Sequence, residues 1–143
     1  SKKKLDILFA AVKRNYRGGV VIKSGFNINR IFYNFDFATS HSTGFYMKRE
    51  IHNEVGLYDT KFKLSADYDM YLRLVLKNKY KFGATPKKRL IGEMKGGGYS
   101  SKFSFFDHLN EESKIRFKNN QNIFYILLIY TNACIKFLIK KFM

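Results

Sequence analysis

One stretch, from Gly56 to Arg73 (GLYDTKFKLSADYDMYLR), constrains the fold of this chain more than any other. It contains three of the eleven acidic residues of a protein whose formal net charge is +16. Apolar and aromatic residues near its end recur at helical spacing, namely Tyr68, Leu72, Val75 and Leu76. This spacing predicts a helix with Asp67 at or just before its N-terminus. The unpaired backbone N–H groups and the dipole at that end favour an ionised carboxylate.

Asp67 therefore has two interpretations. As a helix N-cap, its side chain accepts a backbone hydrogen bond and only stabilises the helix. As a general base, it lies at the rim of a cleft and removes a proton, which requires a fixed orientation and reach. Periodicity alone does not decide between the two. Asp69 and Arg73 are four residues apart, so we expect them to form an ion pair across one helical turn.

The composition is that of a folded protein of single-domain size. The chain has 143 residues, 45% of them hydrophobic, and only one proline, which argues against intrinsic disorder. The single cysteine, Cys134, excludes an intrachain disulfide. One cysteine and three scattered histidines, His41, His52 and His108, do not predict a zinc site.

The 27 basic residues against 11 acidic ones suit an anionic partner. Nucleic acid, an anionic membrane surface, and nucleotide sugars or lipid phosphates are the classes that such a charge attracts. The alternative is a lysine-rich composition of the source, with the lysines on solvated faces. No pattern typical of an RNA-binding or helix-turn-helix domain occurs in the sequence, so nucleic acid is not the expected partner.

Local patterns predict the other elements. Leu5, Leu8, Phe9 and Val12 have the spacing of a short amphipathic helix, which the glycines at 18 and 19 end. Strands are expected at 20–22, 45–47 and 90–94, and helices at 48–55 and 107–118. Gly56 follows the first of these helices and is expected to end it in the left-handed conformation.

The tail, 123–143, has a long apolar stripe with polar residues on its other side. The stripe comprises Phe124, Leu127, Leu128, Thr131, Ile135, Leu138, Ile139 and Phe142. Asn132 and Lys136 interrupt the apolar run, which is then too short for a bilayer span of about twenty apolar residues. Two interpretations stay open: a basic helix in peripheral contact with a membrane surface, or a helix that packs on a missing half of the protein or on a second subunit in a homo-oligomer.

Four short motifs, in a fixed order, point to one family. They are SHSTGFYMKRE at 40–50, VGLYD at 55–59, SADYD at 65–69 followed by LR at 72–73, and GGGYSS at 96–101. From about Ile31 to Ser101 the chain resembles the second half of a family 2 glycosyltransferase of bacterial surface-polysaccharide biosynthesis, which has the GT-A fold. The resemblance implies an α/β fold, part of a GT-A-like nucleotide-diphospho-sugar transferase. It divides the chain into a poorly matched segment 1–30, an acceptor-side region 31–118 and an amphipathic C-terminal helix 119–143.

The resemblance also implies roles for residues. Asp67 matches the base that activates the acceptor hydroxyl, although the preceding Glu of the commonest form is Ala66 here. The glycine segment would close over the diphosphate, because consecutive glycines permit close backbone approach, unless it is an ordinary flexible turn. The candidate substrate-binding residues are His41, Asp69, Arg73, Lys95, Gly97, Gly98 and Ser100. For His41, a hydrogen bond to a neighbouring loop is the alternative role.

The implied reaction is inverting transfer of a sugar from a nucleotide sugar to a hydroxyl of a saccharide or lipid-linked acceptor. Family members need a divalent cation, Mn²⁺ or Mg²⁺, but the first thirty residues contain no Asp-x-Asp pair after an apolar strand to hold it. We therefore expect a fragment that is inactive alone: part of a larger enzyme, a truncated gene product or a remnant. The expected location is cytoplasmic, at the inner face of the cell membrane. The alternative function is a basic, non-catalytic module that binds a membrane surface or RNA.

Overall fold

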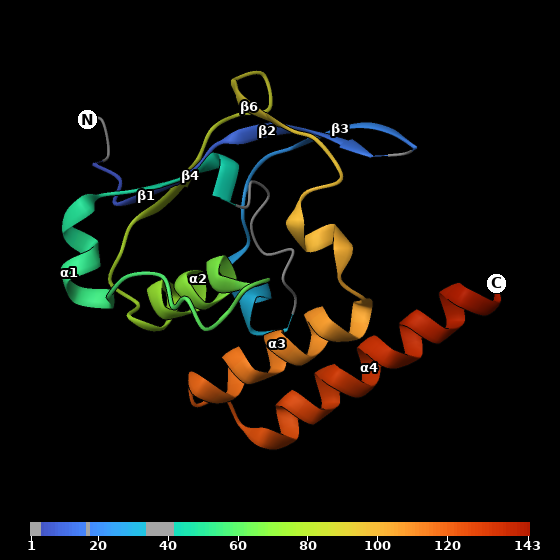
Figure 1. The fold of residues 1–143 in the computed structure, drawn as a ribbon. Coiled ribbons are helices and arrows are strands. Elements are labelled where there is room, and N and C mark those ends of the chain that lie inside the picture. The colour runs from blue at the N-terminus through green and yellow to red at the C-terminus, as the bar shows by residue number, and fades with distance from the viewer. Residues whose placement is uncertain (1–3, 17, 34–41) are drawn as a thin grey trace.

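Two three-stranded sheets form the upper part of the molecule in the computed structural model, which describes residues 4–16, 18–33 and 42–143 (Figure 1). In the first sheet, β1 (Ile7–Phe9) lies between antiparallel β4 (Phe45–Met47) and parallel β5 (Phe82–Ala84). In the second, β2 (Ala11–Tyr16) lies between antiparallel β3 (Gly19–Lys23) and parallel β6 (Leu90–Met94). The described chain is therefore a mixed α/β protein, and segment 1–30 supplies the middle strand of both sheets.

The helix predicted for Leu5–Val12 is wrong, because these residues form β1 and the start of β2. Ile7 and Phe9 point into the core, and Ala10, Ala11 and Val12 are also fully buried. Leu8, on the other face of β1, is half-buried, so all six residues from Ile7 to Val12 are apolar although only one face of β1 points into the core. Such a short run fits helical and extended spacing equally well, so periodicity does not distinguish them.

The other predicted strands are confirmed: β4 and β6 have the expected bounds and β3 contains 20–22. The helix expected at 48–55 is a 3₁₀ turn, Arg49–Ile51, followed by the short helix α1 (His52–Val55). Gly56 ends it with φ 79° and ψ 177°, and its N–H donates to the carbonyl of His52 at 2.9 Å. This backbone conformation differs from the expected left-handed helical one, but it too is open almost only to glycine.

Helix α2 (Ala66–Leu76) lies beneath the sheets and forms the centre of the core (Figure 1). Of the predicted stripe, Tyr68, Leu72 and Val75 are buried, whereas Leu76 is exposed. The helix also buries residues of its other faces, namely Asp69, Met70, Tyr71 and Leu74. The Tyr71 ring lies 4.7 Å from the ring of Phe45 on β4. Packing on several sides holds α2 in place and therefore fixes the orientation of its first turn.

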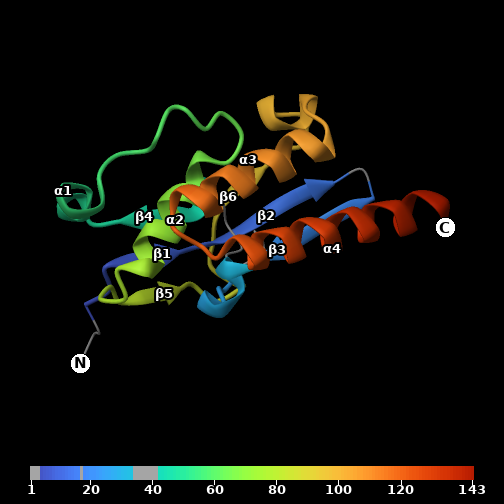
Figure 2. The same cartoon turned by 90° about the horizontal axis from the view of Figure 1, so that it is seen from below.

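Two further helices cover the side of α2 opposite the sheets (Figure 2). Helix α3 (Phe105–Lys118) begins at a capping box in which Ser104 and Asp107 bond each other's backbone N–H groups. It begins two residues before the predicted helix. Helix α4 (Ile123–Phe142) then returns along α3, with the Phe137 ring stacked 4.4 Å from that of Phe105. The guanidinium of Arg116, buried in α3, lies 5.1 Å from the Tyr68 ring and joins α3 to α2.

Candidate functional site

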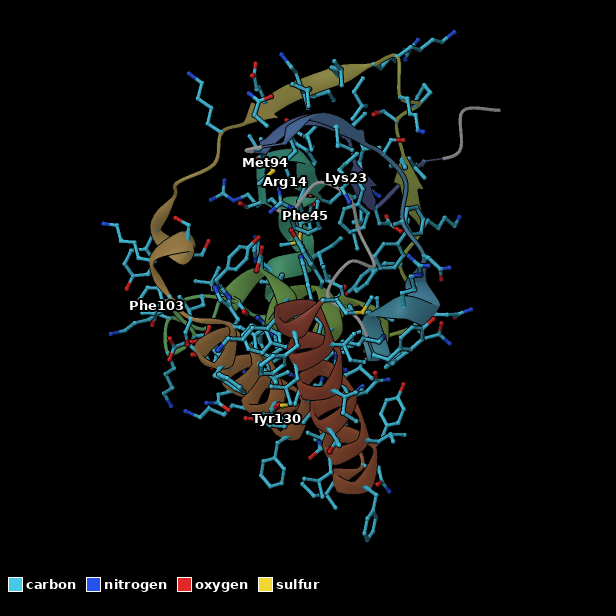
Figure 3. All side chains as sticks on the ribbon, turned by 90° about the vertical axis from the view of Figure 1, so that its right-hand side faces the viewer. Arg14, Lys23, Phe45, Met94, Phe103 and Tyr130 are labelled. Atoms are coloured by element: carbon cyan, nitrogen blue, oxygen red, sulfur yellow. The ribbon has the colours of Figure 1, made fainter. Side chains whose placement is uncertain are left out.

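A cavity of about 600 Å³ lies where the second sheet, the start of α2 and the first half of α3 meet. Its walls come from segments that are far apart in the sequence. They include Arg14 on β2, Met94 on β6, Tyr58, residues 63–67, Ser100, and His108 and Glu112 on α3. Figure 3 shows Arg14 and Met94 together on the sheet side of the molecule. They are register partners in the parallel pair β2–β6.

Asp67 is the second residue of α2 and lines this cavity. The N-cap position belongs to Ser65, so the interpretation of Asp67 as the N-cap is wrong. The Asp67 Oδ1 atom accepts a hydrogen bond from the backbone N–H of Tyr68 at 2.9 Å. Burial raises the pKa of the Asp67 carboxyl above its usual value, although this hydrogen bond opposes the shift. A raised pKa means that the ionised carboxylate binds a proton more readily than an exposed aspartate does.

The loop that leads into α2 is held by Glu111 of α3. Its carboxylate accepts the backbone N–H groups of Lys63 at 3.1 Å, Leu64 at 2.7 Å and Ser65 at 2.7 Å. The Ser65 side chain forms no capping hydrogen bond. The Glu111 carboxylate, from another helix, instead accepts hydrogen bonds from backbone N–H groups at the start of α2. Glu111 therefore positions the first turn of α2, and with it Asp67, against α3.

Asp69 and Arg73 form the predicted ion pair, with 2.9 Å between Oδ2 and Nε. Asp69 is fully buried, and its Oδ1 also accepts from Lys118 Nζ and from Asn119 Nδ2, both at 3.0 Å. Arg73 donates to the backbone carbonyls of Val55 and Leu57 on either side of Gly56. Neither residue lines the cavity of Asp67. The pair fastens α2 to the Gly56 turn and to the end of α3.

The glycine segment lines a second cavity, of about 840 Å³, beside the first. Both cavities have Arg14, Met94 and Ser100 in their walls. The residues that line only the second include Asn15, Lys95, Gly96, Gly97, Gly98 and Ser101. Gly97 has φ +90°, which a residue with a Cβ rarely adopts. The structure thus brings Ser100 into the cavity of Asp67 and places Lys95, Gly97 and Gly98 in the neighbouring cavity, whereas His41 lies outside the described residues.

Sequence reasoning missed Arg14, Tyr58, His108 and Glu112 as cavity residues. His108 Nε2 lies 2.9 Å from the carbonyl oxygen of Ser100, so it joins α3 to the glycine segment. Burial raises the pKa of the Tyr58 hydroxyl, and the nearby charge of Asp67 adds to the shift. One sequence signal could have indicated Arg14, because it is a basic residue that follows an apolar run. That signal is useful only if the run is recognised as a strand. The sequence offers none for the two α3 residues.

The residues do not fit the divalent cation that the family resemblance implies. Within 4–16, 18–33 and 42–143, no three His, Cys, Asp or Glu side chains form a group able to hold a metal ion. The Asp-x-Asp pair at 67–69 does not provide one either, because the carboxylate of Asp69 is bonded to Arg73, Lys118 and Asn119.

In comparisons with known proteins, no family model, no curated protein and no solved structure matches this chain. What the site can do is therefore inferred from its geometry and its residues. The Asp67 carboxyl, whose pKa is raised, lies in the wall of one cavity. The neighbouring cavity is lined by the glycine segment, Lys95 and Arg14.

Proposed function

We propose that this chain is the acceptor-side half of a GT-A-like glycosyltransferase, with Asp67 as the general base. One observation supports the proposal above the others: the Asp67 carboxyl lines the cavity, and burial raises its pKa. A general base is most effective when its pKa lies near the working pH. Each of the four motifs of the family resemblance contributes at least one residue to this cavity: Ser42, Tyr58, residues 65–67 and Ser100.

The proposed step is an in-line displacement. Asp67 takes the proton of the acceptor hydroxyl as its oxygen forms a bond to the anomeric carbon of the sugar. The bond between that carbon and the nucleoside diphosphate breaks, and the leaving group takes the electron pair. The hydrogen bond from the Tyr68 N–H and the packing of α2 fix the carboxyl in one orientation, which a base needs.

The neighbouring cavity has the composition of an anion site. Its wall contains the guanidinium of Arg14, the ammonium of Lys95 and the backbone of three glycines. Successive glycine N–H groups can approach phosphate oxygens closely, and two cations offset the charge of a leaving diphosphate. Arg14 lines both cavities, so it adjoins the cavity of the proposed base and that of the proposed diphosphate.

Asp69 then has a structural role instead of contact with a substrate. Its carboxylate is fully buried among donors from α2 and α3, and it lies outside both cavities. The same applies to Arg73, whose guanidinium bonds the carbonyls around Gly56. The two residues position the helix on which Asp67 acts.

A transfer assay tests the proposal. The chain is incubated with labelled nucleotide sugars, Mn²⁺ and a panel of saccharide and lipid-linked acceptors, alone and joined to the donor-binding half of a family 2 enzyme. We expect no transfer by the chain alone and transfer by the joined protein. Asp67→Asn should lower that transfer by about 100-fold or more, whereas Glu50→Gln, at an exposed position of the Arg49–Ile51 turn, should not change it. Normal transfer by Asp67→Asn would overturn the assignment.

A further inference from the structure

The outer face of α4 is apolar and exposed to solvent. Its most exposed large side chains are Phe124 at 77%, Leu128 at 64% and Phe142 at 82%. Leu127, Ile135, Leu138 and Ile139 belong to the same face. This face is the stripe predicted from the sequence, and α3 contacts a different side of the helix. A soluble protein rarely leaves a continuous apolar strip of this length in water without a partner.

The face continues onto the end of α3. An apolar groove of about 380 Å³ runs between the last turns of α3 and the first turns of α4. Phe117, Ile123 and Leu127 line it, and Phe117 is 67% exposed. Lys114 also lines the groove, so its alkyl stem covers apolar surface while the ammonium can reach a polar phase.

Basic residues accompany the apolar face, and acidic ones do not. Residues 119–143 contain Lys136, Lys140 and Lys141 but no Asp or Glu. The whole chain has a formal net charge of +16. Two copies that met through this face would bring these like charges together, which opposes self-association. An anionic lipid surface offers both an apolar layer for the face and negative charge for the lysines.

Helix α4 also has the length and composition of a membrane span: it has 20 residues, a mean hydropathy of 1.6, and Ile126 as its single buried residue. By these criteria alone it could cross a bilayer, contrary to the expectation from the interrupted apolar run in the sequence. Its packing argues for a different orientation. Ile126 is buried, Tyr130 bonds Asn110 of α3 at 2.9 Å, and Phe137 stacks on Phe105. A span would immerse the charged helix α3 in hydrocarbon or pull it away.

We propose that α4 lies in the plane of an anionic membrane, with its outer face in the boundary between headgroups and acyl chains. The groove at Phe117 belongs to the same contact. Lys136 and Lys141 flank the apolar face on its two sides and extend toward the phosphates, whereas Lys140 and α3 stay on the side of the protein. The proposal does not depend on the chemistry of Asp67.

Vesicle flotation tests it. The full chain is mixed with vesicles of phosphatidylcholine, with and without about 30% phosphatidylglycerol. We expect it to float with the anionic vesicles and at least tenfold less with the neutral ones. The double variant Leu128→Glu, Ile135→Glu should bind the anionic vesicles at least tenfold less than the unchanged chain. The control variant Val20→Glu, Ile91→Glu places the same two charges at exposed apolar positions of β3 and β6, and should bind within threefold of the unchanged chain.

Four outcomes would overturn the proposal. One is that the chain floats with neither kind of vesicle. Another is that both double variants lose binding equally, which would assign the attraction to net charge alone. Resistance to extraction with sodium carbonate at pH 11 would show a spanning helix. A dimer in light scattering that only the α4 variant abolishes would assign the face to a second copy.

Discussion

Asp67 and Asp69 are two residues apart in α2, and we expect their replacement by asparagine to have opposite effects. Asp69→Asn should destabilise the fold, whereas Asp67→Asn should leave stability unchanged or raise it and abolish transfer. The two variants have the same chemical change in the same helix. A difference in stability or transfer between the two variants therefore comes from the different surroundings of the two carboxyls, not from the substitution itself.

The cost of Asp69→Asn follows from its contacts. The carboxylate is fully buried and pairs with Arg73 at 2.9 Å and with Lys118 at 3.0 Å. Removal of one partner of a buried ion pair typically costs 3–5 kcal/mol. Lys118 is partly exposed and Arg73 keeps its carbonyl acceptors, so we take the lower end, about 3 kcal/mol. For a chain of this size that corresponds to a fall in Tm of about 10 °C.

The effect of Asp67→Asn follows from the sign of its pKa shift. Burial raises the pKa of the folded-state carboxyl above its unfolded value. The stability that the protonated carboxyl confers is therefore fully present below the unfolded pKa of about 3.9 and is lost as the pH rises through the folded value. At pH 7 the ionised carboxylate opposes folding, and asparagine removes that charge. The variant should match or exceed the unchanged chain at pH 7, and any gain should vanish below about pH 4.

Calorimetric scans of both variants between pH 4 and pH 8 measure these effects, with urea unfolding as a second probe. Near-ultraviolet circular dichroism checks that each variant keeps its tertiary packing. The reasoning is refuted if Asp69→Asn melts within 2 °C of the unchanged chain at pH 7. It is also refuted if Asp67→Asn is the less stable of the two, because Asp67 would then be the structural carboxylate.

Three further predictions concern the scaffold around Asp67. Glu111→Ala removes the acceptor of three backbone N–H groups before α2 and should cost about 2–3 kcal/mol in urea unfolding; a cost below 0.5 kcal/mol would contradict the assigned role. The Lys118 ammonium holds the pKa of Asp59 below its usual range. The ionised Asp59 therefore stabilises the fold at pH values above its ordinary pKa, and this stability is lost as the pH falls through the lowered pKa. Lys118→Met should therefore raise the pKa of Asp59 in a carbon-13 NMR titration. Gly56→Ala forces a Cβ onto a backbone with φ 79° and should cost about 1–3 kcal/mol, whereas Gly18→Ala, with open space around it, should be nearly neutral.

Strong local signals predicted most of the fold. Strands β3 and β4 could be predicted because short β-branched and aromatic runs, at 20–22 and 45–47, stand out from the residues around them. Helix α2 was predicted from its spacing and from the Asp69–Arg73 pair, which forms as expected. The prediction failed at 5–12, where the uninterrupted apolar run 7–12 shows no alternation that would identify a strand. Local spacing cannot show which sheet partners cover a segment.

The candidate site was predictable only in part, because its walls meet through tertiary contacts. The motif containing Asp67 and the glycine segment with Lys95 could be singled out from sequence, and they line neighbouring cavities. Arg14 could not, since its place depends on the parallel pairing of β2 with β6. Glu111 could not either: its bonds reach residues 46 to 48 positions earlier in the chain.

Helix α3 connects the two proposals. One side of it contributes His108 and Glu112 to the cavity of Asp67, and another side packs on α4. A third cavity, of about 430 Å³, lies between α3 and α4; it includes His108, Glu112 and also Lys136. If α4 lies in a membrane surface, Asp67 stands above it by about two helix layers, roughly 20 Å, since packed helices are 8–10 Å apart. An acceptor held in that membrane must then extend through its headgroup to reach the base. A lipid-linked acceptor with several sugars should therefore be a better substrate than one with a single sugar, and the difference should vanish for the α4 variant that no longer binds vesicles.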